Sequence, residues 1–162
     1  MPATPTPASD LLRTTHRKIE THLDRLLQAL KNMSADRVPV MREDFLAIQR
    51  LASVHFDQEE GVFYPKVRPK APEVLAKMEE QHSVVHETEH YLGELLESFP
   101  ASPTQRQLDE LRLLGIEFHD AIQCHIVDEE DHLLKFADRI LSSDEQDSLA
   151  AVMLRIADDR TF

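Results

Sequence analysis

Residues 53–65 read S-V-H-F-D-Q-E-E-G-V-F-Y-P, and the spacing inside this stretch decides the fold prediction. In a helix, His55 and Glu59 extend from one face, one turn above the other, because they are four residues apart. A neutral imidazole and a carboxylate on one face make half of a metal site of the kind that helix bundles enclose. Residues 123–130, Q-C-H-I-V-D-E-E, repeat the spacing with His125 and Glu129, which predicts a second half-site.

The composition restricts both the fold class and the partners. The 162 residues suit a single domain, which we place over residues 1–162. Three glycines, two tyrosines and no tryptophan favour an all-α protein. Thirty acidic against 18 basic residues give a net charge of −12, which argues against binding to nucleic acid or to an anionic membrane and favours binding of cations.

The sequence also carries signals of cellular location. A single cysteine, Cys124, excludes an intramolecular disulfide and fits a reducing compartment. The first ten residues lack a basic region followed by an apolar run, so no signal peptide is visible. No apolar run approaches the ~20 residues that a membrane-spanning helix needs. We therefore expect a cytoplasmic protein without a membrane partner.

Apolar residues recur at steps of three and four in four long stretches, which is the pattern of bundle helices. We expect residues 1–8, with three prolines, to form an arm, residues 9–141 to form the bundle, and residues 142–160 to form an extra helix. Because the connections are short, the sequence predicts an up-down-up-down four-helix bundle with an additional short C-terminal helix.

Helix boundaries follow from capping residues and prolines. We expect Ser9 or Asp10 to cap the first helix, Thr104 to cap the fourth, and Ser142 or Ser143 to start the fifth. The second helix is expected to stop near Pro65, because the prolines at 65, 69 and 72 forbid a continuous α-helix.

Polar residues interrupt the apolar seams at one level of this bundle. Counting ~3.6 residues per turn from the helix ends places seven groups in one slab near one end. They are His16, His55, Glu59, His82, His86, His125 and Glu129. Burying them unpaired would be costly, and polyvalent cations remove that cost. Five imidazoles and two carboxylates suffice for two ions bridged by the carboxylates, and mixed N/O donors suit iron, with manganese or zinc as alternatives.

With these residues assembled, the sequence resembles the hemerythrin-like (HHE cation-binding) family over residues 11–140. The motifs are T-H-R-K-I-E at 15–20, the segment ending in V-F-Y-P at 51–65, E-E-Q-H-S-V-V-H at 79–86 and H-I-V-D-E-E at 125–130. The resemblance implies a four-helix bundle that holds a non-haem di-iron centre. Its implied ligands are His16, His55, His82, His86 and His125, with Glu59 and Glu129 as bridging carboxylates.

Several nearby residues compete for these roles. His90 follows His86 by four residues, so His86 with His90 is an alternative to His82 with His86. We prefer His82 with His86, because His82 lies on the seam and His90 does not. Glu130 rivals Glu129, since a five-residue step from the histidine also occurs in the family. His132 lies on a seam and is interpreted as a buried or rim histidine rather than a ligand. Glu89, also on a seam, could accept from a ligand imidazole, be an extra ligand or turn to the surface, and we favour the surface. We expect His22 and His119 to be solvated and Cys124 to be a buried thiol.

An open position on one iron would bind a small diatomic molecule. The function expected from the resemblance is therefore binding of O₂, or of NO or peroxide, by a protein that is more a gas-binding protein than an enzyme. The candidate pocket walls are Leu12, Ile19, Val85, Ile122 and Ile126. The alternatives are an iron-dependent oxidase or peroxidase, an iron-holding protein and, in another class, a metal-free interaction or regulatory module. The fifth helix is a candidate surface for a homodimer.

Overall fold

The computed structural model describes residues 3–160, and every element in that range is helical, which confirms the predicted fold class. The four long helices are α1 (Ala8–Lys31), α2 (Val38–Gln58), α4 (Pro72–Glu97) and α5 (Gln105–Asp128). The short ones are a 3₁₀ turn at Ala35–Arg37, α3 (Tyr64–Val67) and α6 (Lys135–Ile140), and α7 (Ser143–Asp159) is the extra helix. Two π-helical segments, η2 (Glu59–Phe63) and η3 (Glu129–Leu134), join α2 to α3 and α5 to α6.

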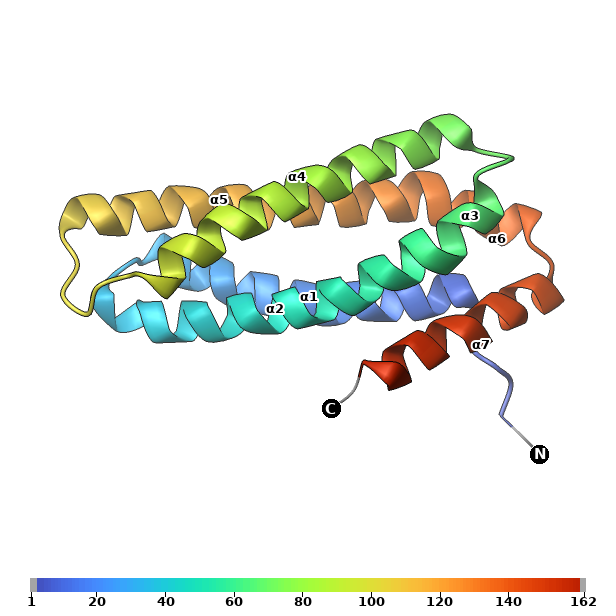
Figure 1. The fold of residues 1–162 in the computed structure, drawn as a ribbon, viewed down its shortest axis with the longest axis horizontal. Coiled ribbons are helices and arrows are strands. Elements are labelled where there is room, and N and C mark those ends of the chain that lie inside the picture. Colours follow the sequence, from blue (N-terminus) through green and yellow to red (C-terminus); the bar gives the residue numbers. More distant parts are fainter. Residues whose placement is uncertain (1–2, 161–162) are drawn as a thin grey trace.

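The four long helices lie side by side, and their connections alternate between the two ends of the structure (Figure 1). α1 packs against α2 and α5, and α4 packs against α5. α7 returns along one end and contacts α1 and α2, close to the start of the chain (Figure 1). No helix within residues 3–160 is long and apolar enough to cross a membrane.

Two of the predicted helix starts are confirmed and one is wrong. Thr104 and Ser142 each cap a helix in a capping box, in which the cap side chain and the side chain three residues later satisfy each other's backbone N–H groups. α1, however, begins at Ala8 after Pro7 and has no side-chain cap. The backbone N–H of Ser9 instead donates to Gln146 Oε1 on α7 at 3.0 Å, so the extra helix satisfies the free donor of the first turn.

The second helical stretch ends near Pro65, as expected, although it runs past the proline itself. Helical structure continues through η2 and α3 to Val67, and Pro65 lies in the first turn of α3. The π-helical segment shifts the hydrogen-bond register from i→i+4 to i→i+5 and starts a new α-helical segment after it. A proline is tolerated there, because the first turn of a helix needs no N–H from it. The same shift at η3 carries the fourth helix on to Ile140.

The core consists of two apolar clusters. The larger one fills the bundle from Ile19 on α1 and Phe56 on α2 to Val85 and Ile126 on the other two helices. The smaller one lies under α7 and contains Leu12, Phe63, Tyr64, Met78, Leu133 and Leu134, among others. His16 on α1 and His82 on α4 lie between members of the two clusters, and Glu59 and Glu129 do the same where α2 continues into η2 and α5 into η3. The two clusters therefore enclose a layer of buried polar side chains.

Candidate metal centre

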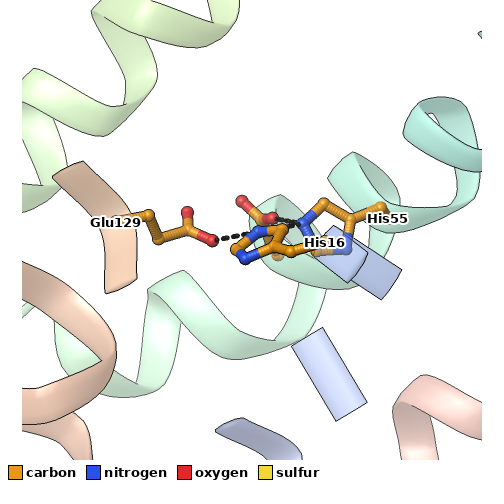
Figure 2. Close-up of side chains that lie close together, drawn as sticks. His16, His55 and Glu129 are labelled. Atoms are coloured by element: carbon orange, nitrogen blue, oxygen red, sulfur yellow. Dashed lines mark hydrogen bonds and ion pairs between the residues drawn. The ribbon is translucent and has the colours of Figure 1, made fainter. Parts of the chain in front are cut away.

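Six of the seven predicted ligands meet in this layer, and each has at most 2% of its surface exposed. They are His16 on α1, His55 on α2, His82 on α4 and His125 on α5, with Glu59 and Glu129 as the first residues of η2 and η3. Figure 2 shows His16, His55 and Glu129 pointing toward one another from three different helices. Each long helix thus contributes one histidine to a single buried cluster.

The six residues form two overlapping groups. One contains His16, His55, Glu59 and Glu129, and the other contains Glu59, His82, His125 and Glu129. Within each group one ligand atom per residue lies within 4.8 Å of all the others. Both glutamates belong to both groups, which is the arrangement expected of carboxylates that bridge two neighbouring ions.

The oxygens of each glutamate face different halves of the cluster. Glu129 Oε1 lies 3.2 Å from His16 Nε2, and Glu129 Oε2 lies 3.4 Å from His125 Nε2. Glu59 Oε1 pairs with His55, and Glu59 Oε2 lies 3.0 Å from His82 Nε2. Neither Oε1 atom has a hydrogen bond within the described residues, although both are fully buried. Buried carboxylate oxygens without donors are stabilised by a cation.

Three of the four histidines donate their outer N–H to a protein acceptor. His16 Nδ1 lies 2.8 Å from Glu130 Oε2, His82 Nδ1 lies 2.7 Å from Glu60 Oε1, and His125 Nδ1 lies 3.0 Å from Gln81 Oε1. Such outer acceptors are typical of metal-binding histidines, because they place the proton on Nδ1 and leave the Nε2 lone pair for the ion.

The inner nitrogens then meet in pairs. His16 Nε2 lies 3.0 Å from His55 Nε2, and His82 Nε2 lies 3.0 Å from His125 Nε2. With the protons on Nδ1, each pair brings two lone pairs together, which is unfavourable unless a proton or a cation lies at that position. The donor set, nitrogen and carboxylate oxygen without sulfur, fits iron, manganese or zinc. The residues present therefore fit two bridged metal ions.

The two halves of the site are equivalent in chain order. His16 is followed 39 residues later by His55, and His82 is followed 43 residues later by His125. The outer acceptors are exchanged between the halves. Glu60, which follows Glu59, accepts from His82, and Glu130, which follows Glu129, accepts from His16. Glu130, a rival ligand in the sequence, is thus an outer acceptor that also pairs with Arg17.

Tyr64 is a site residue that the sequence did not predict. Its hydroxyl donates to Glu59 Oε2 at 2.5 Å, also contacts Glu129 Oε2, and lies 3.1 Å from His82 Nε2. In an α-helix a residue five positions after Glu59 would point to another face, but the π-helical segment returns it to the same one. The available signal was Pro65, which fits a continuing helix only if the register shifts before it.

Ionisation follows from these contacts. Burial opposes the charged form of His16 and of His82, but bonds to the carboxylates outweigh it and raise the pKa of each to about 9. Burial likewise opposes ionisation of Glu59, yet the imidazole of His55 and its neighbours hold the pKa of that carboxyl well below its usual range. Burial, then the two carboxylates, raise the pKa of Tyr64. Without metal, protons stabilise the cluster where ions would.

His86, the seventh predicted ligand, lies outside the cluster. Its side chain is exposed in a groove between α2 and α4, lined also by Phe45, Glu89 and His90. The ring of Phe56 contacts the His86 ring edge-on at a centroid distance of 5.5 Å and stacks on His82 at 3.9 Å. An aromatic ring therefore separates His86 from the buried histidines. His90, the other rival, is exposed and pairs with Glu94 at 3.3 Å.

The remaining polar residues differ in part from expectation. His132 is exposed and Glu89 is half-buried in the α2–α4 groove. His119, expected to be solvated, is buried beside Asp120, and His22 is half-buried and bonded to Asp44 at 3.0 Å. Cys124, expected to be buried, is exposed, because one step along α5 from His125 turns it toward solvent. All five expected wall residues are buried.

The fold and the buried cluster define a helical-bundle protein with a histidine- and carboxylate-lined cation site. The chain belongs to the hemerythrin family, because the model of the hemerythrin HHE cation binding domain matches residues 8–137. Neither a search of curated proteins nor a search of solved structures found a match.

Proposed function

We propose that this protein holds two iron ions in an up-down-up-down four-helix bundle and binds O₂, NO or peroxide there. His16 and His55 would hold one ion, His82 and His125 the other, with Glu59 and Glu129 bridging. The observation that carries the proposal is the facing of Nε2 atoms at 3.0 Å in two adjacent pairs, with outer acceptors on three of the four rings. Iron would supply reversible binding of a diatomic molecule at a coordination position that the protein leaves open.

The protein's own residues set the number of open positions. If both glutamates bridge, each ion receives two nitrogens and two oxygens from the chain. A six-coordinate ion would then keep two positions, and an oxo or hydroxo bridge between the ions would fill one of them. Each ion would thus keep one position for a small ligand, rather than one in the whole site. This count follows from the placement of His86 outside the cluster.

The surrounding side chains keep the site dry and hold one proton. The two apolar clusters exclude water above and below the polar layer, with Leu12, Ile19 and Ile126 among the buried neighbours. The Tyr64 hydroxyl stays protonated at ordinary pH, because its pKa is raised. It donates a hydrogen bond to the proposed bridging carboxylates. It therefore orients the carboxylates and offers a hydrogen-bond donor inside a closed pocket.

A second candidate function is consumption of peroxide. Two observations favour it: the chain supplies only four donors to each ion, and the Tyr64 hydroxyl lies among the ligands. A diatomic carrier needs one open position, whereas turnover of a bound oxidant benefits from neighbouring positions and a proton donor. The same site thus serves either function, and kinetics distinguish them.

The test is anaerobic reconstitution with ferrous iron, followed by titration with O₂, NO and hydrogen peroxide. We expect two equivalents of iron per chain and a visible spectrum that changes with each ligand. Reversal under vacuum supports O₂ binding, and catalytic loss of peroxide supports the second function. A chain that takes up no metal, remains colourless and keeps its helical content would overturn both and support the metal-free interaction module.

A further inference from the structure

A second cavity lies directly behind His55. It is a groove of about 730 Å³ between α1, α2 and the end of α7, a volume typical of sites for small molecules. Its lining includes Thr15, Lys18, Arg50, His55 and Arg160. Because His55 Nε2 points into the metal centre, this groove adjoins the outer side of a proposed ligand.

His55 differs from the other three histidines at its outer nitrogen. His16, His82 and His125 each have an acceptor for Nδ1, whereas His55 Nδ1 is buried and has no hydrogen-bond partner within the described residues. A buried donor without an acceptor is costly. His55 is among the residues that line the groove, so an acceptor from outside the chain would approach Nδ1 from there, displacing the side chains that cover this atom.

The equivalence of the two halves explains why the acceptor is missing. In one half Gln81, the residue before His82, accepts from His125 Nδ1. The matching residue in the other half is Thr15, immediately before His16. Its short side chain donates instead to the backbone carbonyl of Leu11 at 3.2 Å and lines the groove. The groove thus occupies the position that a glutamine side chain fills in the other half.

The charge of the groove indicates what fills it. Three basic residues and no carboxylate line it, on a chain whose net charge is −12. Arg160 is paired with Asp57 and bonds Ser53, and His22, also in the lining, is bonded to Asp44. Lys18 and Arg50 form no ion pair with any residue in the range 3–160. Two basic side chains that have no ion pair within residues 3–160, beside a buried donor, match a negatively charged oxygen acceptor.

We propose that this groove binds a small oxyanion, a carboxylate or a phosphate, held by Lys18 and Arg50 and accepting a hydrogen bond from His55 Nδ1. The contact to His55 rests on the proposed function, because a metal ion on Nε2 fixes the proton on Nδ1. The positive charge of the groove does not depend on the proposed function. The anion takes the role that Gln81, Glu60 and Glu130 have on the other rings, so it strengthens the bond from His55 to the metal.

The test is calorimetric titration of the full chain with sodium phosphate and with sodium succinate, using sodium chloride at matched ionic strength as the control. We expect saturable binding of one or both oxyanions, and the tighter of the two identifies the class. In Lys18→Gln/Arg50→Gln binding should weaken tenfold or more. Lys31→Gln/Arg112→Gln, which makes the same change of charge at exposed positions outside the groove, should bind as the natural chain does.

A second variant tests the geometry without removing charge. In Thr15→Gln the longer amide occupies the part of the groove beside His55 and supplies the acceptor for its Nδ1, so anion affinity should fall severalfold while metal binding is kept. The proposal would be overturned if the natural chain showed no saturable anion binding. It would also be overturned if Lys18→Gln/Arg50→Gln bound the anion as tightly as the natural chain, because the anion would then be bound elsewhere, for example directly to the metal.

Metal loading separates this proposal from the proposed function. Zinc-loaded chain should bind the anion severalfold more tightly than metal-free chain, and by linkage the anion should raise zinc affinity by the same factor. Equal anion affinity in the two forms would overturn the hydrogen bond to His55. A chain that binds no metal but binds phosphate through Lys18 and Arg50 would refute the proposed function alone.

Discussion

Two imidazole nitrogens 3.0 Å apart, repeated twice, are the residue-scale feature on which the metal site depends. In the metal-free chain burial opposes protonation of these rings, but the neighbouring carboxylates favour it and raise the pKa of His16 and of His82 to about 9. An ion that enters must displace those protons. The same geometry therefore explains both the metal-free and the metal-loaded cluster.

A pair of substitutions on α4 tests which histidines are ligands. His82→Ala should lower metal affinity roughly a hundredfold or more, because it removes a proposed ligand. Loss of a hydrogen-bond partner behind a ligand already lowers metal affinity ~10–100-fold. His86→Ala should retain the metal, because the exposed His86 ring is separated from the cluster by Phe56. Metal content after dialysis measures both. Equal loss in the two variants would restore His86 as a fifth histidine ligand.

Substitution of the buried phenol tests the role of the Tyr64 hydroxyl. Tyr64→Phe removes a donor shared by Glu59 and Glu129, so the metal-free chain should lose about 1–3 kcal/mol of unfolding free energy. Urea denaturation in chelator measures the loss. Tyr91→Phe is the matched control, because Tyr91 is 51% exposed and should change stability little. Identical stability of Tyr64→Phe and the natural chain would contradict the hydrogen bonds to the carboxylates.

At the scale of elements, the two π-helical segments determine what the site contains. Each begins at a glutamate of the buried cluster, so the register shift starts at a proposed ligand. π-helical turns inside α-helices are rare and frequently mark functional sites. Here the shift brings the residue five positions after the glutamate back to the cluster, which is how Tyr64 reaches it.

Much of the site could be predicted from the sequence, because helical spacing and seam position are local. His55 and Glu59, like His125 and Glu129, share a face in any α-helix. Tyr64 could not be predicted in this way, since a 3.6-residue period directs it elsewhere. His86 lies four residues after His82 on the same helix, and the Phe56 ring that contacts both is a tertiary contact, which helical spacing does not reveal.

Close packing of α5 against α1 and α2 gives a prediction for an element. A Cβ on Gly115 would lie 2.5 Å from Leu30 Cδ2 and 3.0 Å from Met41 Cε, and both side chains are fully buried. Gly115→Ala should therefore destabilise the protein by about 1–3 kcal/mol. Gly93→Ala, whose Cβ would meet only Phe45 at 3.5 Å, should be neutral or stabilise by up to about 1 kcal/mol.

Thermal or urea unfolding of the two alanine variants makes the comparison. Both sites are helical and gain the same intrinsic propensity, so their difference isolates the helix contact. A Gly115→Ala variant as stable as Gly93→Ala would show that Leu30 and Met41 move aside without cost.

At the scale of the whole molecule, the polar layer divides the core into two apolar clusters and joins all four long helices. Stability should therefore depend on what occupies that layer. In the metal-free chain protons on His16 and His82 fulfil this role, and their contribution is present below the ordinary imidazole pKa of ~6.5 and lost as pH rises through about 9.

The prediction is a fall in unfolding free energy of the metal-free chain between pH 6.5 and 9. Each histidine contributes on the order of 3 kcal/mol at most, and the sum is smaller because both share the same carboxylates. Metal-loaded chain should show no such fall, and apparent metal affinity should rise over the same window as fewer protons need displacing. Urea unfolding at a series of pH values, with chelator and with metal, measures this dependence. An unfolding free energy that does not change with pH in chelator would contradict the raised pKa values.

One of the buried positions at which the matching halves of the centre differ carries a hydroxyl in one half alone. Five residues after Glu59 stands Tyr64, and five residues after Glu129 stands Leu134, both fully buried. The ion beside His82 and His125 would therefore meet a phenol oxygen, whereas its neighbour beside His16 and His55 would not. Two ions with identical histidine and carboxylate donors would then be electronically distinct, giving separate Mössbauer doublets and allowing one position to fill before the other or to retain a different element.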